Sequence, residues 1–436
     1  MNAGPRSSRP GRRATRRTPP HAQGESPQHG EDRTPPPGAR SDRRRTARRA
    51  RARRAVRRRN AALGLAGLLA AVTGTLYLVH GAGGGQAAAR SGTGSGPSGE
   101  PAAAGQGTSA APSARGGNHT GTGTDGTLTL AFAGDVHFTG RTAGRLTVDP
   151  ALGPMSAQLA AADFSMVNLE SAITTRGTPQ AKIYHFRTSP AALTALHDSG
   201  VDAVTMANNH AVDYGPQGLA DSVAAKHASP IPVIGIGANQ AEAYRPYTET
   251  VHGVRLAVLA ASQVYDITNS DFRAGPATPG IASALDRPRL LAAVRAAKAH
   301  ADVVVVYLHW GIEGESCPVA DQKSIAADLS AAGATAVVGT HAHVMLGSGM
   351  LGPTYVAYGF GNFLWYGSSP YPHSDDTGVT TITVTRAGKV TGARFTPGTV
   401  GGDGVPQPQT GAAAAGITDR YGQLRRCSGL TAPPGG

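Results

Sequence analysis

Short apolar segments alternate with helical segments between residues 127 and 402, and this pattern is compatible with few folds. Some apolar segments, such as 302–309 (DVVVVYLH), lack polar alternation, which is typical of strands buried on both faces of a sheet. The segment 189–200 is typical of a helix, because Pro190 lies in its first turn and Gly200 follows its end. The pattern predicts an α/β domain, and the excess of strands suggests two sheets packed between helices.

The expected elements follow one another at short intervals. Strands are expected at 127–134, 164–170, 201–207, 231–237, 254–262, 302–309, 335–341 and 353–363, with a hairpin over 379–395. Helices are expected at 189–200, 215–229, 286–301 and 320–334. We assign the domain to 127–402 and expect 403–436 to be a poorly ordered C-terminal tail, except around Cys427.

The N-terminal segment 1–59 has a different composition from the rest of the chain. Residues 1–60 contain 19 arginines against four acidic residues, whereas the remainder has 22 basic and 24 acidic residues. The formal charge of +13 therefore belongs to the tail, and the main domain gives no support to nucleic-acid binding. Because it has few large apolar side chains, the segment 1–59 is expected to be disordered.

An uncharged apolar stretch follows this tail at 61–79. As a helix it would extend about 28 Å, close to the thickness of a bilayer's hydrocarbon core. We expect a single-pass signal anchor at 60–80 in the cell membrane, with the arginine-rich N-terminus in the cytoplasm and the main domain outside. The alternative is a cleaved signal peptide, because QAAAR at 86–90 offers a small-residue cleavage site.

The segment 81–126 is expected to be a flexible linker. Fifteen of its 46 residues are glycine, and Ser, Thr, Ala and Pro make up most of the rest. Such a chain has a root-mean-square reach of roughly 35–40 Å, so it would hold the domain away from the membrane surface.

Metal-ligand and acid–base side chains follow five of the expected strands. Ligands of open α/β sheets bind at the carboxyl ends of the strands, so these side chains are expected to share one rim. The candidates are Asp135, His137, Glu170, Asn208, Asn209, His210, Asp213, His309, His341 and His343. This mixture of carboxylate, imidazole and amide groups predicts a site for Mn, Fe or Zn.

Two of these histidines, His341 and His343, are one residue apart in the segment GTHAHV at 339–344. If the backbone stays extended, alternate side chains project to the same side and both imidazoles can serve the same centre. The candidate ligands are too many for one tetrahedral ion and suit two divalent ions that share a carboxylate. His210 is then the natural acid–base group, because Asp213 lies three residues on and can fix its tautomer.

The chain has two cysteines, Cys317 and Cys427, and no CxxC spacing. A thiolate zinc site is therefore not expected. Outside the cytoplasm an even pair of cysteines favours a disulfide, so we predict a bond between Cys317 and Cys427. This bond would pin the C-terminal tail beside the loop that follows His309.

Seven segments of the domain together resemble the CapA family of capsule and poly-γ-glutamate biosynthesis proteins, which looks like part of the calcineurin-like metallophosphoesterase superfamily. The segments are GDVHFTGR, NLESAIT, FRTSP, ANNHAVDYG, HWGIE, GTHAHV and YGFGNF, within residues 128–366. The resemblance implies a four-layer α/β/β/α sandwich. It also implies an anionic cell-envelope polymer such as poly-γ-glutamate as partner, and membrane partners in a capsule synthesis complex.

The resemblance also implies roles for individual residues. Asp135, His137 and His343 would form the first metal site, Glu170 would bridge the ions, and Asn209, His309 and His341 would complete the second site. His210 matches the histidine of the superfamily's Asn-His pair, which lies near the substrate's phosphate. The chain departs from the superfamily in having glutamate at the bridging position and in the displacement of the acid after Asn-His to Asp213.

Lys182 and Arg187, in KIYHFRTSP, are candidates to meet an anionic substrate, and Asn208 is a further candidate for substrate binding. The alternative for the two cations is a solvated loop or an internal salt bridge. Two functions follow from these observations: a metal-dependent hydrolase that cleaves a phosphoester or amide bond in the polymer, and a non-catalytic component that binds the polymer during export.

Overall fold

The computed structural model describes residues 126–435. The tail, the signal anchor and nearly all of the linker expected from the sequence lie outside these residues. Within the described range, no helix is both long enough and apolar enough to cross a bilayer.

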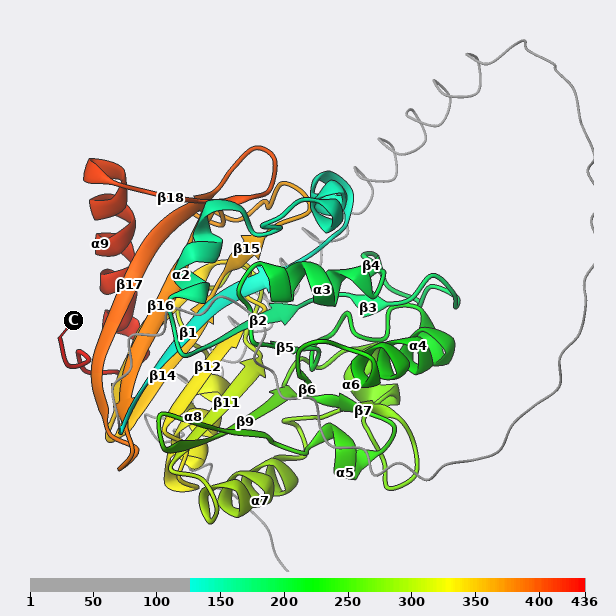
Figure 1. Ribbon diagram of the computed structural model, residues 1–436, viewed down its shortest axis with the longest axis horizontal. Helices are drawn as coiled ribbons and strands as arrows, with labels where there is room; N and C mark the ends of the chain where they lie inside the picture. The colour runs from blue at the N-terminus through cyan, green and yellow to red at the C-terminus, as the bar shows by residue number, and fades with distance from the viewer. Residues whose placement is uncertain (1–125, 436) are drawn as a thin grey trace, which may run out of the picture. The chain divides into compact units, whose positions relative to one another are not determined.

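Among residues 126–435, the larger sheet has eight strands in the order β18-β17-β16-β1-β2-β5-β6, with β15 paired to β1 (Figure 1). The strands are β1 (Thr127–Val136), β2 (Phe164–Leu169), β5 (Ala203–Thr205), β6 (Val233–Ile234), β15 (Asn362–Leu364), β16 (Asp376–Thr385), β17 (Val390–Val400) and β18 (Pro406–Pro408). Strands β1, β2, β5 and β6 run parallel, and β16 with β17 forms the predicted hairpin beside β1.

The second sheet of the described region has six strands in the order β13-β14-β12-β11-β9-β8. They are β8 (Tyr247–Val251), β9 (Val254–Ser262), β11 (Val303–His309), β12 (Ala336–Thr340), β13 (Met345–Leu351) and β14 (Thr354–Phe360). Strands β9, β11, β12 and β14 are parallel, and the edge strands β8 and β13 are antiparallel to their neighbours. Two short pairs, β3 (Ala172–Ile173) with β4 (Arg187–Thr188) and β7 (Ile236–Gly237) with β10 (Gly280–Ile281), complete the strands.

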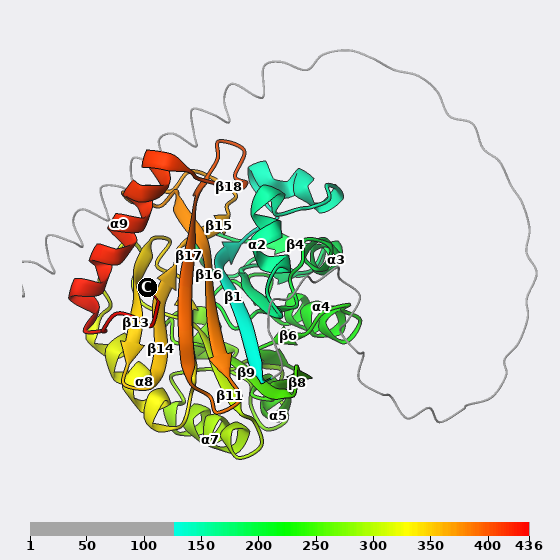
Figure 2. The same ribbon diagram turned by 60° about the vertical axis from the view of Figure 1, so that its left-hand side comes forward.

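Helices cover the outer faces of the two sheets (Figure 2). The longer ones are α3 (Ala191–Asp198), α4 (Gly215–His227), α7 (Arg287–Lys298), α8 (Ala320–Ala331) and α9 (Gly411–Ser428). The shorter ones are η1 (Gly140–Thr147), η2 (Gly153–Met155), α2 (Ser156–Ala160), α5 (Gln240–Ala243) and α6 (Ile267–Asp271). All four helices expected from the sequence are present, with ends within three residues of the expected ones.

Three clusters of buried apolar side chains fill the spaces between the layers. Apolar residues of α3 and α4 pack on the outer face of the larger sheet, and those of α7 and α8 pack on the outer face of the second sheet. Between the sheets, residues such as Phe132, Val258 and Tyr307 form a third cluster. Side chains of the central strands therefore alternate between two cores, which explains their continuous apolar runs. The described residues form helix, sheet, sheet and helix layers, and the predicted α/β class is confirmed.

The C-terminal region corrects one expectation. Residues 403–435 are not a poorly ordered tail: they form β18 and the 18-residue helix α9, which packs on the second sheet. Ile417 and Tyr421 are buried at helical spacing and contact Met345 at the start of β13. Cys427 in the last turn of α9 forms the predicted disulfide with Cys317. Packing on the second sheet and the disulfide hold α9 in place, although its glycine- and alanine-rich sequence shows little of the apolar spacing typical of a helix.

Candidate metal centre

The candidate ligands come from the carboxyl ends of strands in both sheets. Asp135 and His137 belong to the end of β1, Glu170 follows β2, His309 ends β11, and His341 follows β12. A close approach of the backbone builds this corner, since a Cβ at Gly134 would collide with the carbonyl oxygen of Gly361. The N–H of Asp135 donates to the same oxygen at 3.0 Å, which joins β1 to the segment that begins β15.

Glu170 lies at the middle of the cluster. Its Oε1 is 3.3 Å from Nε2 of His309 and 3.9 Å from Nε2 of His210, and its Oε2 is 3.7 Å from Nε2 of His137. All four side chains are buried. Two sets of three side chains have ligand atoms within 4.8 Å of one another: Asp135, Glu170 and His309, and Glu170, His341 and His343. Glu170 belongs to both sets, as expected for a residue shared by two ions.

These compact sets do not divide the ligands between two ions, because Nδ1 of His341 lies 3.1 Å from Nε2 of His309 although the two residues belong to different sets. His137 belongs to neither set, and its Nε2 lies 3.7 Å from Oε2 of Glu170. His343 keeps the expected contact with Asp135, at 3.5 Å between Nδ1 and Oδ2. Asn209 joins the cluster through its side-chain oxygen, 2.7 Å from Nε2 of His309.

Two of the candidate ligands have buried polar atoms without hydrogen-bond partners in the described region. Within residues 126–435, both carboxylate oxygens of Glu170 and both ring nitrogens of His137 have no hydrogen-bond partner. Leaving buried polar atoms without partners is costly, and cations would satisfy the two oxygens of Glu170 and one ring nitrogen of His137. The chemistry of the donors, carboxylate and imidazole without thiolate, fits Mn, Fe or Zn, so the residues fit divalent ions.

Burial and neighbouring charges shift the pKa values of the candidate ligands. Burial, together with the Asp135 carboxylate, raises the pKa of Glu170 well above its ordinary value. Burial lowers the pKa of His309 to about 4 and also lowers the pKa values of His137 and His341. These imidazoles are therefore neutral at pH 7, the form in which histidine binds metals.

Asp135 and His343 behave as an ion pair within this cluster. Burial opposes the charge on Asp135, but His343 and its positive charge hold the pKa of Asp135 well below the usual range. Burial likewise opposes the charge on His343, and the hydrogen bond with Asp135 raises the pKa of His343 to about 9. A metal ion would replace the proton on His343, because both compete for the same nitrogen lone pair.

The His-x-His pair converges for a different reason from the one expected. Strand β12 ends at Thr340, and the next residues form bends rather than extended backbone. His341 has φ +100° and His343 has φ +57°, both in a region that non-glycine residues rarely adopt. The imidazoles meet at Glu170 because the chain turns there, and the strained backbone is typical of a functional site.

Asn168 is a residue of the candidate site that was not predicted from the sequence. Its Nδ2 donates to Oδ1 of Asp135 at 2.8 Å and lies 3.2 Å from Nδ1 of His309, so one amide orients two candidate ligands. Its Oδ1 accepts a hydrogen bond from Nδ2 of Asn208 at 2.9 Å. The signal was its spacing: Asn168 lies two residues before Glu170, on the same side of the end of β2. Asn362 plays a similar part for His343, with Oδ1 3.2 Å from Nδ1.

His210 is held by the displaced acid. Its Nδ1 is 2.7 Å from Oδ2 of Asp213, and this leaves Nε2 directed toward Glu170. Oδ2 of Asp213 also accepts from the N–H of Phe186, and Oδ1 faces the ammonium of Lys182 at 2.7 Å. Burial raises the pKa of Asp213 to about 6, against the effect of Lys182. Asp213 therefore fixes the ring of His210, as predicted.

The three candidate substrate-binding residues lie in different surroundings. Lys182 pairs with Asp213 and donates to the carbonyl of Asn209 at 2.6 Å, so the internal salt bridge describes it better than a free cation. Asn208 is fully buried, and its side chain bonds to Asn168, Leu169 and the N–H of His210. These contacts make Asn208 a support of the loop, and its role in substrate binding stays a prediction. Arg187 is exposed over the ring of Tyr214.

Fold and site together define an α/β protein with a buried candidate site for divalent cations at the carboxyl ends of its strands. The family model of the bacterial capsule synthesis protein PGA_cap matches residues 129–366, more than half of the chain. The chain belongs to this family.

Curated relatives agree with this assignment. The chain is 31% identical over 251 residues to the PGA biosynthesis protein CapA of Bacillus subtilis (strain 168), covering 56% of this chain and 65% of that protein. It is 27% identical to the capsule biosynthesis protein CapA of Bacillus anthracis, covering 42% of this chain and 45% of that protein. The matches thus span less than two thirds of the length of these relatives.

Among solved structures, the chain is similar to the 5'-nucleotidase precursor from Thermus thermophilus, with 15% identity and a TM-score of 0.39. That match covers 68% of this chain and 58% of the other.

Proposed function

We propose that this chain is a CapA-like protein of capsule or poly-γ-glutamate biosynthesis whose metal centre hydrolyses a phosphoester or amide bond of a cell-envelope polymer. Membership of the PGA_cap family and the names of the Bacillus relatives support the pathway. The observation that carries the hydrolytic part is Glu170, a buried carboxylate without hydrogen-bond partners in the described region, surrounded by imidazoles from both sheets.

The residues that would hold two divalent ions are Asp135, His137, Glu170, Asn209, His309, His341 and His343. When bound, such ions act as Lewis acids and activate water at neutral pH. His210 contributes acid–base chemistry, because Nδ1 is fixed by Asp213 and Nε2 faces the centre. Lys182 keeps Asp213 in place by pairing with its second oxygen.

We also propose that residues 60–80 anchor the protein in the cell membrane, with the domain outside and the N-terminus in the cytoplasm. The uncharged stretch 61–79 after the arginine-rich tail supports this placement. The disulfide between Cys317 and Cys427 accords with an oxidising compartment. Fractionation of cells that express the full chain should recover it in the membrane at its full mass. A shortened, soluble product would favour the cleaved signal peptide.

The hydrolase proposal is tested with the full-length protein by metal analysis and a chromogenic phosphoester assay with Mn²⁺, repeated with a γ-glutamyl oligomer. His210→Ala should lower turnover on the order of 10²–10⁴-fold while the metal content is retained. His300→Ala, an exposed histidine after α7, is the matched control and should leave both unchanged. Bound metal without turnover on either substrate would favour the non-catalytic polymer-binding role.

A further inference from the structure

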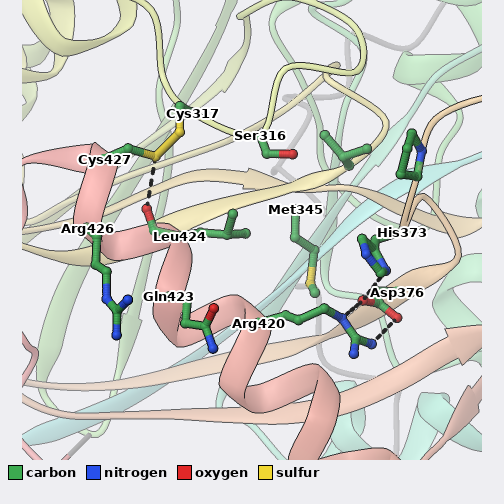
Figure 3. Close-up of a pocket in the computed structure, with 12 residues that line it drawn as sticks. Ser316, Cys317, Met345, His373, Asp376, Arg420, Gln423, Leu424, Arg426 and Cys427 are labelled. Atoms are coloured by element: carbon green, nitrogen blue, oxygen red, sulfur yellow. Dashed lines mark hydrogen bonds and ion pairs between the residues drawn. A yellow bond between two sulfur atoms is a disulfide. The ribbon is translucent and has the colours of Figure 1, made fainter.

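A cavity of about 370 Å³ lies away from the ligand cluster, between α9 and three loops (Figure 3). Its walls come from the loop after β11, the start of β13, the segment before β16 and one face of α9. The volume is within the range of small-ligand sites, about 300–1,000 Å³, and is enough for a short piece of a polymer.

An arginine lies at each end of this cavity. Arg426 lies at the end beside the disulfide, and Arg420 lies at the opposite end next to His373 and Asp376 (Figure 3). Arg420 donates twice to Asp376, at 2.8 and 2.9 Å, which neutralises the carboxylate that lines the cavity. Arg426 is exposed and has no hydrogen bond or ion pair with any described residue. The cavity therefore presents a net positive charge.

The wall between the two arginines is largely apolar. Val344, Met345 and Leu424 line it, together with Pro372 and the sulfur atoms of the disulfide. A ligand that matches this surface has an apolar stem and an anionic group that meets Arg426. A γ-linked glutamyl chain has this chemistry, because methylene carbons lie in its main chain and each unit carries a free α-carboxylate.

The cavity touches segments that support the metal centre. Val344 directly follows His343, and Cys317 lies in the loop that follows His309. The amide of Asn362, which orients His343, also donates to the carbonyl of Ser374, the residue after His373. A chain held in the cavity would thus lie against the same loops that position the ligands.

We propose that this cavity is a second binding site for the polymer, which holds an anionic γ-glutamyl segment while another part of the chain meets the metal centre. The inference rests on the proposed function, since that function supplies the polymer. It assigns α9 and the disulfide a role in substrate recognition, because both build walls of the site.

The test is calorimetric titration of the full-length protein with γ-linked tetraglutamate, with metal and after chelation. Arg426→Glu should weaken binding roughly tenfold, because a favourable charge contact is replaced by a repulsive one. Gln423→Glu, on the same wall of α9, should weaken binding in the same direction. Arg295→Glu is the matched control, since Arg295 is exposed in the last turn of α7, as Arg426 is in the last turn of α9.

The site is supported if binding survives chelation and falls in the two α9 variants but not in Arg295→Glu. It is overturned if all three variants weaken binding equally, which would indicate the overall charge of the protein. It is also overturned if chelation abolishes binding or if no binding occurs. The proposed function is judged separately, by metal content and by turnover of His210→Ala, so the two ideas can fail independently.

Discussion

The amino and carboxyl ends of the parallel strands differ in whether their polar groups have hydrogen-bond partners within the protein. At the amino ends, three aspartates that directly precede a strand each accept a hydrogen bond from the backbone N–H of the neighbouring strand. The pairs are Thr129 with Asp163 at 2.8 Å, Ser165 with Asp202 at 2.8 Å, and Arg255 with Asp302 at 2.9 Å. At the carboxyl ends, Glu170 and His137 have no hydrogen-bond partner among the described residues.

The difference separates stability from function along the same strands. A backbone N–H at the start of a strand needs an acceptor, and an aspartate one strand away supplies it, so the amino edge is complete without a ligand. At the carboxyl edge, the oxygens of Glu170 and the ring nitrogens of His137 lie among other candidate ligands but have no hydrogen-bond partner in the described region. Substitutions at the carboxyl edge should therefore change metal binding, and those at the amino edge should change the free energy of unfolding.

The largest effect on metal binding is expected from Glu170→Gln. Because Glu170 belongs to both candidate ligand sets, metal affinity should fall by more than about 100-fold. The melting temperature without metal should hardly change, since glutamine keeps the size of the side chain and burial raises the pKa of Glu170, which disfavours its charged form. Metal titration followed by thermal unfolding measures both quantities. Glu315→Gln, an exposed acid in the loop after β11, is the control, and equal affinity for both variants would contradict the site.

A smaller effect is expected from Asn168→Ala. This change removes the amide that orients Asp135 and His309 and should lower metal affinity about 10–100-fold. The same titration checks it. If affinity stayed at the wild-type value, Asn168 would have only a packing role.

Asp202→Ala tests the amino edge. It leaves the buried N–H of Ser165 without its acceptor and should lower the free energy of unfolding by about 1–3 kcal/mol. Metal affinity should be unchanged, and denaturant unfolding with metal titration measures both. Asp419→Ala, exposed on α9, should change stability by less than about 0.5 kcal/mol. If Asp202→Ala also lost metal, the claim that the amino edge affects only stability would be wrong.

The smallest effect is expected at the exposed pair of Arg255 and Asp302. Hydrogen bonding from Arg255 lowers the pKa of Asp302 to about 2, below its ordinary 3.8. The contribution of this ion pair to the free energy of unfolding is therefore present above pH 4 and lost as the pH falls toward 2. Arg255→Gln should lower the free energy of unfolding only slightly at pH 7, and the difference from wild type should be smaller at pH 3. Urea unfolding at both pH values tests this, and a difference that grows at pH 3 would show the sign to be wrong.

The layers could be predicted from the sequence because strands that are buried on both faces have continuous apolar runs. It also predicted which residues meet at the carboxyl edge, since parallel strands end together. The antiparallel edge strand β8 was missed because its half-buried residues alternate with exposed ones, so it lacks a continuous apolar run. Strand β13 was missed although it is largely buried, because two glycines and a serine interrupt its apolar residues. Helix α9 was missed because only Ile417 and Tyr421 mark its buried face within a glycine- and alanine-rich segment.

Other features of the site depend on conformation that residue types do not encode. The positive φ values of His341 and His343 replace the extended geometry that alternate spacing suggested. The internal pairing of Lys182 follows from Asp213, which lies far along the chain and becomes its neighbour only in the fold. Asn168 gave a weaker signal than an acid or a histidine, because an asparagine before a loop usually has a local role.

Anomalous diffraction from crystals of the protein grown with Mn²⁺ would locate the ions. We expect two anomalous peaks that share Glu170, one near Asp135, His137 and His343 and the other near Asn209, His309 and His341. The absence of any peak within bonding distance of Glu170 would contradict the account.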